Sequence, residues 1–157
     1  KSMIFKRPRK HWRKCGRRMK KDSKERMLYC ESCHNMEFPK ICPAVIIGVT
    51  DGDKILISEG CTHHRQCGDI GTEKLPNWIR EYTGKQPEFH FTSGTEFPED
   101  VSDYKLIIHC GGCMLNEREM RSRLRSAADQ EIPMTNYGIA IAYMKGILER
   151  SVECLGL

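Results

Sequence analysis

The chain has 157 residues, enough for one ordinary domain or for a small and a medium one. No stretch approaches the roughly 20 consecutive apolar residues of a membrane helix, so we expect no membrane contact. Nine cysteines, with no signal-peptide apolar region at the start, favour a reducing cytoplasmic setting and bound metal over secreted disulfides. The net charge of +5 divides into +11 over residues 1–29 (13 Lys and Arg, 2 acidic) and −6 over residues 30–157 (13 against 19).

The basic N-terminal part contains two pairs of soft metal ligands. His11 and Cys15 form the first pair, and Cys30 and Cys33, with two residues between them, form the second. Two such pairs, about fifteen residues apart, suit a tetrahedral zinc site. We therefore predict a zinc-ribbon-like segment over residues 1–43. The alternative is a disordered tail with free thiols, whose positive charge could bind nucleic-acid phosphates without sequence preference.

The first apolar run after this segment favours a buried strand. It covers residues 44–50 and follows Pro43. The turn signal Asp51-Gly52-Asp53 comes next, and residues 54–58 are a second apolar run. This order makes a β-hairpin plausible.

From residue 54 onward, strand and helix patterns alternate. Asn116 has capping-box spacing to Glu119, and the apolar positions Met120, Leu124 and Ala127 trace one helical face after it. Single helices between strands imply parallel pairing. We predict an α/β domain over residues 44–157, a small parallel sheet with flanking helices: strands at 54–58, 88–92, 105–109 and 132–135, and helices at 76–82 (closed by Gly84), after Asn116, and at 137–152.

Potential metal ligands follow two of these strands. Cys61 and His63 come after residues 54–58, whereas His109, Cys110 and Cys113 end or follow residues 105–109. Ligands in open parallel sheets sit beyond the carboxyl ends of the strands. Three converging thiolates without an obvious fourth favour a 4Fe-4S cluster with one distinctive iron. Zinc, with His63 or His109 completing a tetrahedron, is the other interpretation.

The text around these ligands is also distinctive. The amino-acid sequence there contains Cys-x-His followed by His-Cys-x2-Cys. Residues 59–71, 82–85 and 104–116 contain further segments that belong to the same pattern. Residues 54–152 resemble the C-terminal cluster-binding domain of the FeFe-hydrogenase maturation GTPase family, HydF. The resemblance implies that Cys61, Cys110 and Cys113 ligate iron.

In the family that these residues resemble, the fourth ligand of the cluster varies. His63, His109, Asp69 and an external ligand are therefore all candidates for this position. An exchangeable position suits a scaffold or carrier that accepts a transient di-iron fragment and delivers it. The partners that the resemblance implies are the hydrogenase apoprotein and the radical-SAM maturation proteins.

Residues 10–57 carry a second resemblance. Arg13-Lys14-Cys15-Gly16, Cys30-x2-Cys33 and the text of residues 38–47 resemble the zinc-ribbon lead-in of NADH pyrophosphatase-type Nudix hydrolases. The catalytic Nudix box is absent, since Arg121, Ser122 and Arg123 stand where carboxylates are required.

The sequence also lacks a phosphate-binding GTPase loop. We therefore predict a cofactor scaffold and no enzyme. Two alternatives are a zinc module that uses its basic N-terminus on nucleic acid and an iron–sulfur enzyme of the hydro-lyase type.

Overall fold

The fold is built around four parallel strands with helices on both faces. The computed structural model describes residues 19–22, 27–30, 43–60, 68–112, 114–148 and 150. The order is β1 (Met19–Asp22), β2 (Met27–Cys30), a 3₁₀ helix η2 (Pro43–Gly48), β3 (Lys54–Ser58), a π-helical turn η3 (Ile70–Lys74), α2 (Leu75–Thr83), β4 (Glu88–Thr92), β5 (Tyr104–His109), α3 (Glu117–Asp129), β6 (Met134–Asn136) and α4 (Tyr137–Met144).

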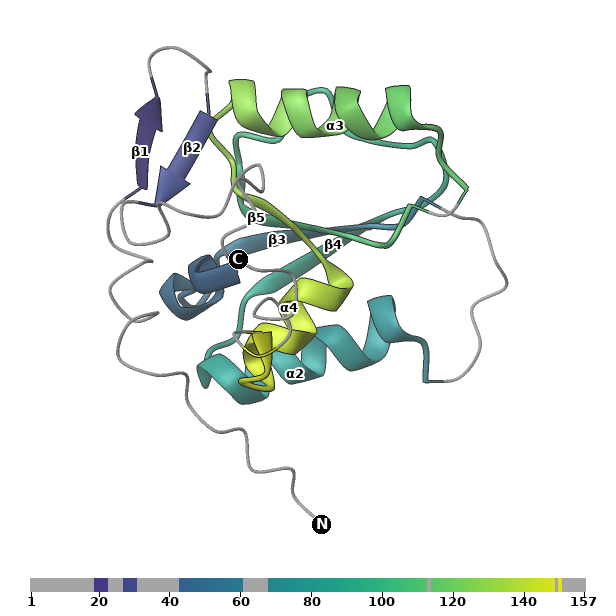
Figure 1. Cartoon of the computed structure of the whole chain (residues 1–157). Helices are drawn as coiled ribbons and strands as arrows, with labels where there is room; N and C mark the ends of the chain where they lie inside the picture. Colours follow the sequence, from purple (N-terminus) through teal and green to yellow (C-terminus); the bar gives the residue numbers. More distant parts are fainter. Residues whose placement is uncertain are drawn as a thin grey trace.

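The main sheet has the strand order β4-β3-β5-β6, and every neighbouring pair is parallel. Figure 1 shows α3 on one side of this sheet and α2 and α4 on the other. Parallel strands need crossover connections, and helices in these crossovers cover both faces of a sheet. The predicted α/β class with a small parallel sheet and flanking helices is confirmed.

Both faces of the sheet are buried in apolar cores. Ile55 and Ile57 of β3 face the core that α2, α4 and η2 complete, whereas Leu56 between them faces the second core. On the second side, Ile107 of β5 packs with Ala127 of α3. Successive side chains of a strand point to opposite faces, so near-continuous apolar runs are what a two-sided core requires.

The predicted strand at residues 44–50 is wrong. Residues Pro43–Gly48 form the 3₁₀ helix η2, in which Ile46 is buried and Ile47 is exposed. The predicted hairpin fails with it, because β3 already pairs with β4 on one edge and with β5 on the other. No edge of β3 is left for a hairpin partner. The Asp51–Gly52 turn instead leads from η2 into β3.

The helix boundaries mostly follow their sequence signals. α2 ends at Thr83, and the following Gly84 caps it: Gly84 adopts φ +69° and donates its N–H to the Arg80 carbonyl at 2.8 Å. α3 begins after Asn116, whose Oδ1 accepts the Glu119 N–H at 2.8 Å. Both ends agree with the prediction. The sequence pattern did not predict the π-helical turn η3 before α2.

The final helix is shorter than predicted. α4 ends at Met144 because Gly146 takes φ +69°, a left-handed conformation that a helix cannot continue through. The start at Tyr137 agrees with the prediction, and residues 151–157 lie outside the described residues.

A separate two-stranded antiparallel sheet lies within the predicted zinc-ribbon segment. β1 and β2 pair with Met19 opposite Cys30. Of the four predicted zinc ligands, Cys30 falls in the described backbone, at the end of β2; His11, Cys15 and Cys33 lie outside it. No helix in the described parts of the chain is long and apolar enough to cross a membrane.

Candidate metal centre

The carboxyl ends of the four parallel strands carry a row of polar side chains. The strand register aligns Thr92 with Ser58, Ser58 with His109, and His109 with Asn136. Ser58 and His109 are buried, and Thr92 Oγ1 donates a hydrogen bond to Ser58 Oγ at 3.1 Å. Ligand sites of open parallel sheets lie just beyond such an edge. The segments that follow β3 and β5 carry the predicted cluster ligands.

Cys110 is the first residue beyond β5, and its thiol lies against two backbone amides. Gly60 N–H donates to Cys110 Sγ with an N–S distance of 2.9 Å, and Gly112 N–H donates at 3.4 Å. The Cys110 N–H in turn donates to the Ser58 carbonyl at 3.0 Å. Backbone amides directed at sulfur stabilise negative charge on it and are a feature of iron–sulfur sites.

Glycine is required on both sides of this thiol. A Cβ on Gly60 would lie 2.8 Å from the Leu115 side chain, and Gly112 has φ +69° with Met120 Sδ 3.0 Å from where its Cβ would be. Side chains at either position would displace the amides from the sulfur. Of the two glycines between Cys110 and Cys113, Gly112 therefore has a geometric reason, whereas a Cβ at Gly111 would have no atom within 4 Å.

The other predicted ligands fall partly outside the described residues. Cys61, His63 and Cys113 are not described, but each cysteine directly follows a glycine whose N–H donates to Cys110 Sγ. The structure thus brings the chain leading to both other cysteines against one thiol. Within the described residues alone, there is no group of three His, Cys, Asp or Glu side chains that could hold a metal ion.

His109 is buried, with both ring nitrogens engaged. Nδ1 lies 2.7 Å from the Cys110 carbonyl oxygen, and Nε2 lies 3.2 Å from Nη1 of Arg123. Burial is the main cause that lowers the pKa of His109, and the nearby Arg123 charge lowers it further, against the opposing effect of the Cys110 hydrogen bond. The imidazole is therefore neutral at neutral pH.

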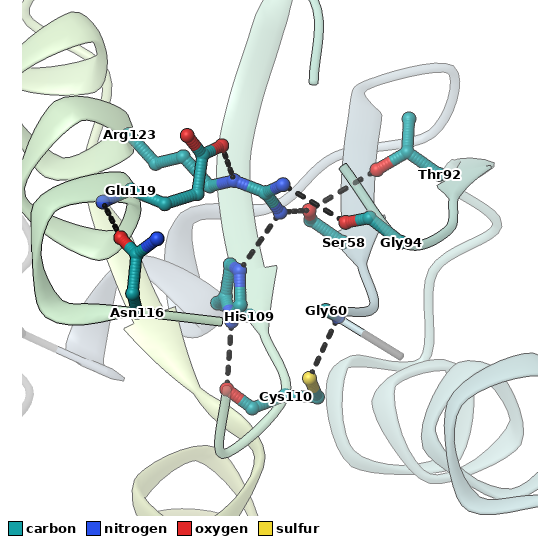
Figure 2. Close-up of polar contacts among 9 residues, drawn as sticks. All are labelled: Ser58, Gly60, Thr92, Gly94, His109, Cys110, Asn116, Glu119 and Arg123. Atoms are coloured by element: carbon teal, nitrogen blue, oxygen red, sulfur yellow. Dashed lines mark hydrogen bonds and ion pairs between the residues drawn. The ribbon is translucent and has the colours of Figure 1, made fainter. Parts of the chain in front are cut away.

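Arg123 of α3 is the most unexpected residue at this edge, because only 1% of its surface is exposed. Figure 2 shows its guanidinium between α3 and the ends of the strands. Its contacts come from four places in the chain: Nε to Glu119 Oε1 at 2.8 Å, Nη1 to Ser58 Oγ at 3.2 Å, Nη1 to His109 Nε2 at 3.2 Å and Nη2 to the Gly94 carbonyl at 2.9 Å.

A second polar cluster lies beside the thiol. Tyr137, at the start of α4, donates its hydroxyl to Glu59 Oε1 at 3.2 Å, and buried Gly71 packs against both groups. Burial raises the pKa of Tyr137, and the negative charges of Glu59, Cys110 and Asp69 add to this increase. The Asp69 carboxylate caps η3 by accepting the Thr72 N–H at 2.9 Å and the Thr72 hydroxyl at 3.0 Å.

Sequence reasoning missed Arg123, Ser58, Glu59 and Tyr137 as members of this region. Glu59 and Ser58 directly precede the Gly60-Cys61 pair, so their position at the strand end was a usable signal. Tyr137 follows Asn136, the last residue of β6. Arg123 lies on the helix face of Met120 and Ala127, where a charged residue predicts a buried partner.

Comparison with known proteins gives two results for different parts of the chain. The family model described as "Hydrogen maturase F tetramerization domain" matches residues 43–154, well over half of the chain. A 44-residue stretch is 39% identical to the NAD-capped RNA hydrolase NudC of Pseudomonas fluorescens strain Pf0-1 and 41% identical to that of Pseudomonas putida strain F1. That stretch is 28% of this chain and 16% of each relative, so the chain spans a small part of these proteins.

Proposed function

The chain belongs to the hydrogen maturase F tetramerization domain family, and from this premise we propose that its α/β domain is a 4Fe-4S cluster-binding scaffold of hydrogenase maturation. As a scaffold or carrier, it would accept a di-iron cofactor precursor and deliver it to a hydrogenase apoprotein. The radical-SAM maturation proteins would be its other partners. This role needs a protected cluster with one exchangeable iron position, and it needs no turnover by the chain itself.

The observation that carries the proposal is the environment of Cys110 Sγ. Two backbone amides donate to this sulfur, and they belong to the residues directly before Cys61 and Cys113. A donor set of three cysteines, approached by amide N–H groups at the end of a parallel sheet, fits the chemistry of a cubane cluster. Cys61, Cys110 and Cys113 would hold the cluster.

The residues around the cysteines would have separate tasks. The amides of Gly60 and Gly112 would stabilise sulfur charge, and the cluster when bound would supply an iron that exchanges its fourth ligand. His63, Asp69, His109 and an external ligand are the candidates for that position. Zinc at the same cysteines, with His63 or His109 as the fourth ligand, is the competing assignment for the metal.

The family name also bears on assembly. We expect the chain to associate through this domain, since the matching family is described as a tetramerization domain. Light scattering coupled to size-exclusion chromatography measures the mass directly. A monomer at micromolar concentration, with and without the cluster, would argue against association.

We further propose a structural zinc ion in the N-terminal segment, bound by His11, Cys15, Cys30 and Cys33. The resemblance of residues 10–57 to a zinc-ribbon lead-in and the antiparallel pairing of β1 with β2, which ends at Cys30, support it. A segment this small has almost no core, so roughly 10–16 kcal/mol of zinc binding would supply its order. A zinc chelator should make the segment sensitive to trypsin and leave the iron chromophore intact. Purified protein without zinc whose N-terminus already resists trypsin would contradict the zinc site.

Anaerobic reconstitution tests the cluster. We expect about four iron and four sulfide per chain, as a cubane cluster requires, with broad visible absorption. Cys61→Ala, Cys110→Ala and Cys113→Ala should each abolish retention of the cluster. Cys30→Ala is the matched control: it removes a thiol from the proposed zinc set and should retain the iron. Zinc as the only metal at these cysteines, with oxygen strictly excluded, would refute the proposal.

A further inference from the structure

Arg123 has no part in holding a cluster as described so far, yet it is the largest buried polar side chain at the sheet edge. We propose that Arg123 is a positioning residue for the cluster site: its hydrogen bond to His109 Nε2 fixes the imidazole that holds the Cys110 carbonyl, and this keeps His109 away from iron. The inference rests on the proposed cluster-binding function. It also reduces the set of candidates for the fourth ligand.

The guanidinium joins parts of the chain that must stay in register for the site to exist. Its partners are the side chains of Ser58 at the end of β3 and His109 at the end of β5, the carbonyl of Gly94 after β4, and Glu119 one turn earlier on α3. Four of the five N–H groups of this planar, rigid guanidinium thus have acceptors. The same charge lies over the Phe97 ring, 5.2 Å from its centroid.

The chemistry of the donors fixes the tautomer of His109. Arginine only donates hydrogen bonds, so His109 Nε2 must accept from Nη1. A carbonyl oxygen only accepts, so Nδ1 must carry the proton and donate to Cys110. The ring therefore has no lone pair left for a metal ion. Binding iron through either nitrogen would break one of these two bonds.

The path from Arg123 to the Cys110 thiol is short, and hydrogen bonds connect each of its residues to the next. Arg123 holds the imidazole of His109, the imidazole holds the Cys110 carbonyl, and the Cys110 thiol receives the N–H of Gly60. Figure 2 shows these contacts as one continuous series. Groups that bond a metal ligand directly typically change metal affinity by about 10–100-fold. His109 bonds the backbone of Cys110 directly and Arg123 is one hydrogen bond further away, so we expect an effect at the lower end of this range.

Lysine could not replace this arginine, because an ammonium group is a point charge without the planar fork that reaches several acceptors at once. A buried cation with one acidic partner is costly, and Glu119 is itself 36% exposed at its side chain. The positioning role therefore depends on the shape of the guanidinium and not only on its charge.

The test combines two measurements on the full chain. Nitrogen-15 NMR of the metal-free protein reports which nitrogen of His109 is protonated. Iron release from the reconstituted protein to a chelator, followed with the EPR spectrum of the reduced cluster, reports on the site. The variants are Arg123→Lys and Arg123→Met. The controls are Arg121→Met, an exposed arginine two residues away, and Leu124→Ala, which removes apolar packing of the same helix against the second core.

We expect His109 to be protonated at Nδ1 alone in the wild type and to lose this fixed state in both Arg123 variants. Iron release should become roughly 10-fold faster in Arg123→Lys, with broadened EPR features, and remain within about 2-fold of wild type in both controls. If Arg123→Met does not fold, Arg123→Lys decides the question. Unchanged EPR and release rates in a folded Arg123→Lys protein would overturn the inference, as would faster release in Leu124→Ala of the same size.

Failure of the proposed function gives a different result. If the wild-type chain never retains iron and sulfide, the cluster assignment falls, while the NMR measurement still shows whether Arg123 fixes His109. If the cluster forms and His109 ligates it, the wild-type EPR spectrum should change in His109→Ala and not in Arg123→Lys. That outcome refutes the positioning role and leaves the scaffold function intact.

Discussion

Replacing Gly71 with alanine tests how tightly the region beside Cys110 is packed. A methyl group at position 71 would overlap Glu59 Oε1 and the hydroxyl of Tyr137, which bond to each other at 3.2 Å. Glu59 is 8% exposed, and the Tyr137 ring packs against the first core. Neither group can move away without losing its hydrogen bond.

The magnitude follows from two losses. Overpacking by one methyl group costs about 1–3 kcal/mol, and a hydrogen bond to a charged group contributes about 1.5–3 kcal/mol. Because partial movement relieves one loss at the expense of the other, we expect Gly71→Ala to lower the free energy of unfolding by about 2–3 kcal/mol. For a chain of this size the midpoint of thermal unfolding should fall by roughly 4–12 °C.

Urea unfolding of the metal-free protein, followed by far-ultraviolet circular dichroism, measures the effect. Gly48→Ala is the matched control, since Gly48 is exposed and has no atom within 4 Å of the added carbon; its effect should stay within about 0.5 kcal/mol. In a Tyr137→Phe background, Gly71→Ala should cost about 1 kcal/mol less, because the hydroxyl is already gone. A Gly71→Ala protein as stable as the Gly48→Ala control would refute this account of the packing.

Three further changes have effects that the structure sets. Asn116→Ala removes the cap that accepts the Glu119 N–H and should cost about 1 kcal/mol in urea unfolding, whereas Asn116→Asp should cost little. Gly84→Ala should cost about 1 kcal/mol through its φ of +69° alone, because the added carbon meets open space; an unchanged midpoint would argue against that backbone conformation. Burial raises the pKa of Tyr137, so the folded state keeps a phenolic proton that an unfolded chain loses above about pH 10. The free energy of unfolding should therefore fall as pH rises above about 10, and Tyr137→Phe should show less of this fall.

Most of the main sheet was predictable because its strands are short, apolar and separated by helix signals. Residues 54–58, 88–92 and 105–109 became β3, β4 and β5 with at most one residue of difference. Parallel order also followed, since no hairpin connects these strands. The alternation of strand and helix carries topological information that does not depend on any single residue.

The error at residues 44–50 has a physical cause in the sheet itself. A run of β-branched and apolar residues fits a strand as well as a buried helical turn, and local pattern does not separate the two. The pairing of β4 with β3 excludes the strand, because β4 occupies the edge of β3 that a hairpin partner would use. That pairing lies more than thirty residues away in sequence, so only the completed sheet could exclude the strand.

The candidate site was likewise only partly predictable from the sequence. The position of Cys110 at the carboxyl edge followed from the strand that precedes it, but the donors to its sulfur did not. Gly60 reaches the thiol because β3 and β5 are neighbours in register, and Gly112 reaches it because its backbone is left-handed. Sequence spacing gives neither contact.

A stricter use of helical periodicity would have predicted that Arg123 is buried against the sheet. It lies three residues after Met120 and four before Ala127, so 3.6-residue spacing already places it on the face of α3 that packs on the sheet. A buried guanidinium must find acceptors, and the nearest polar groups of a parallel sheet are at its strand ends. A charged residue on an otherwise apolar helix face, in a helix that follows a His-Cys strand end, thus predicts contact between that helix and that edge. The same rule separates Arg123 from Arg121, which lies on the exposed face and pairs with Glu117 at 2.5 Å. Two arginines in one helix therefore differ in role through periodicity alone, and the buried one reaches the site.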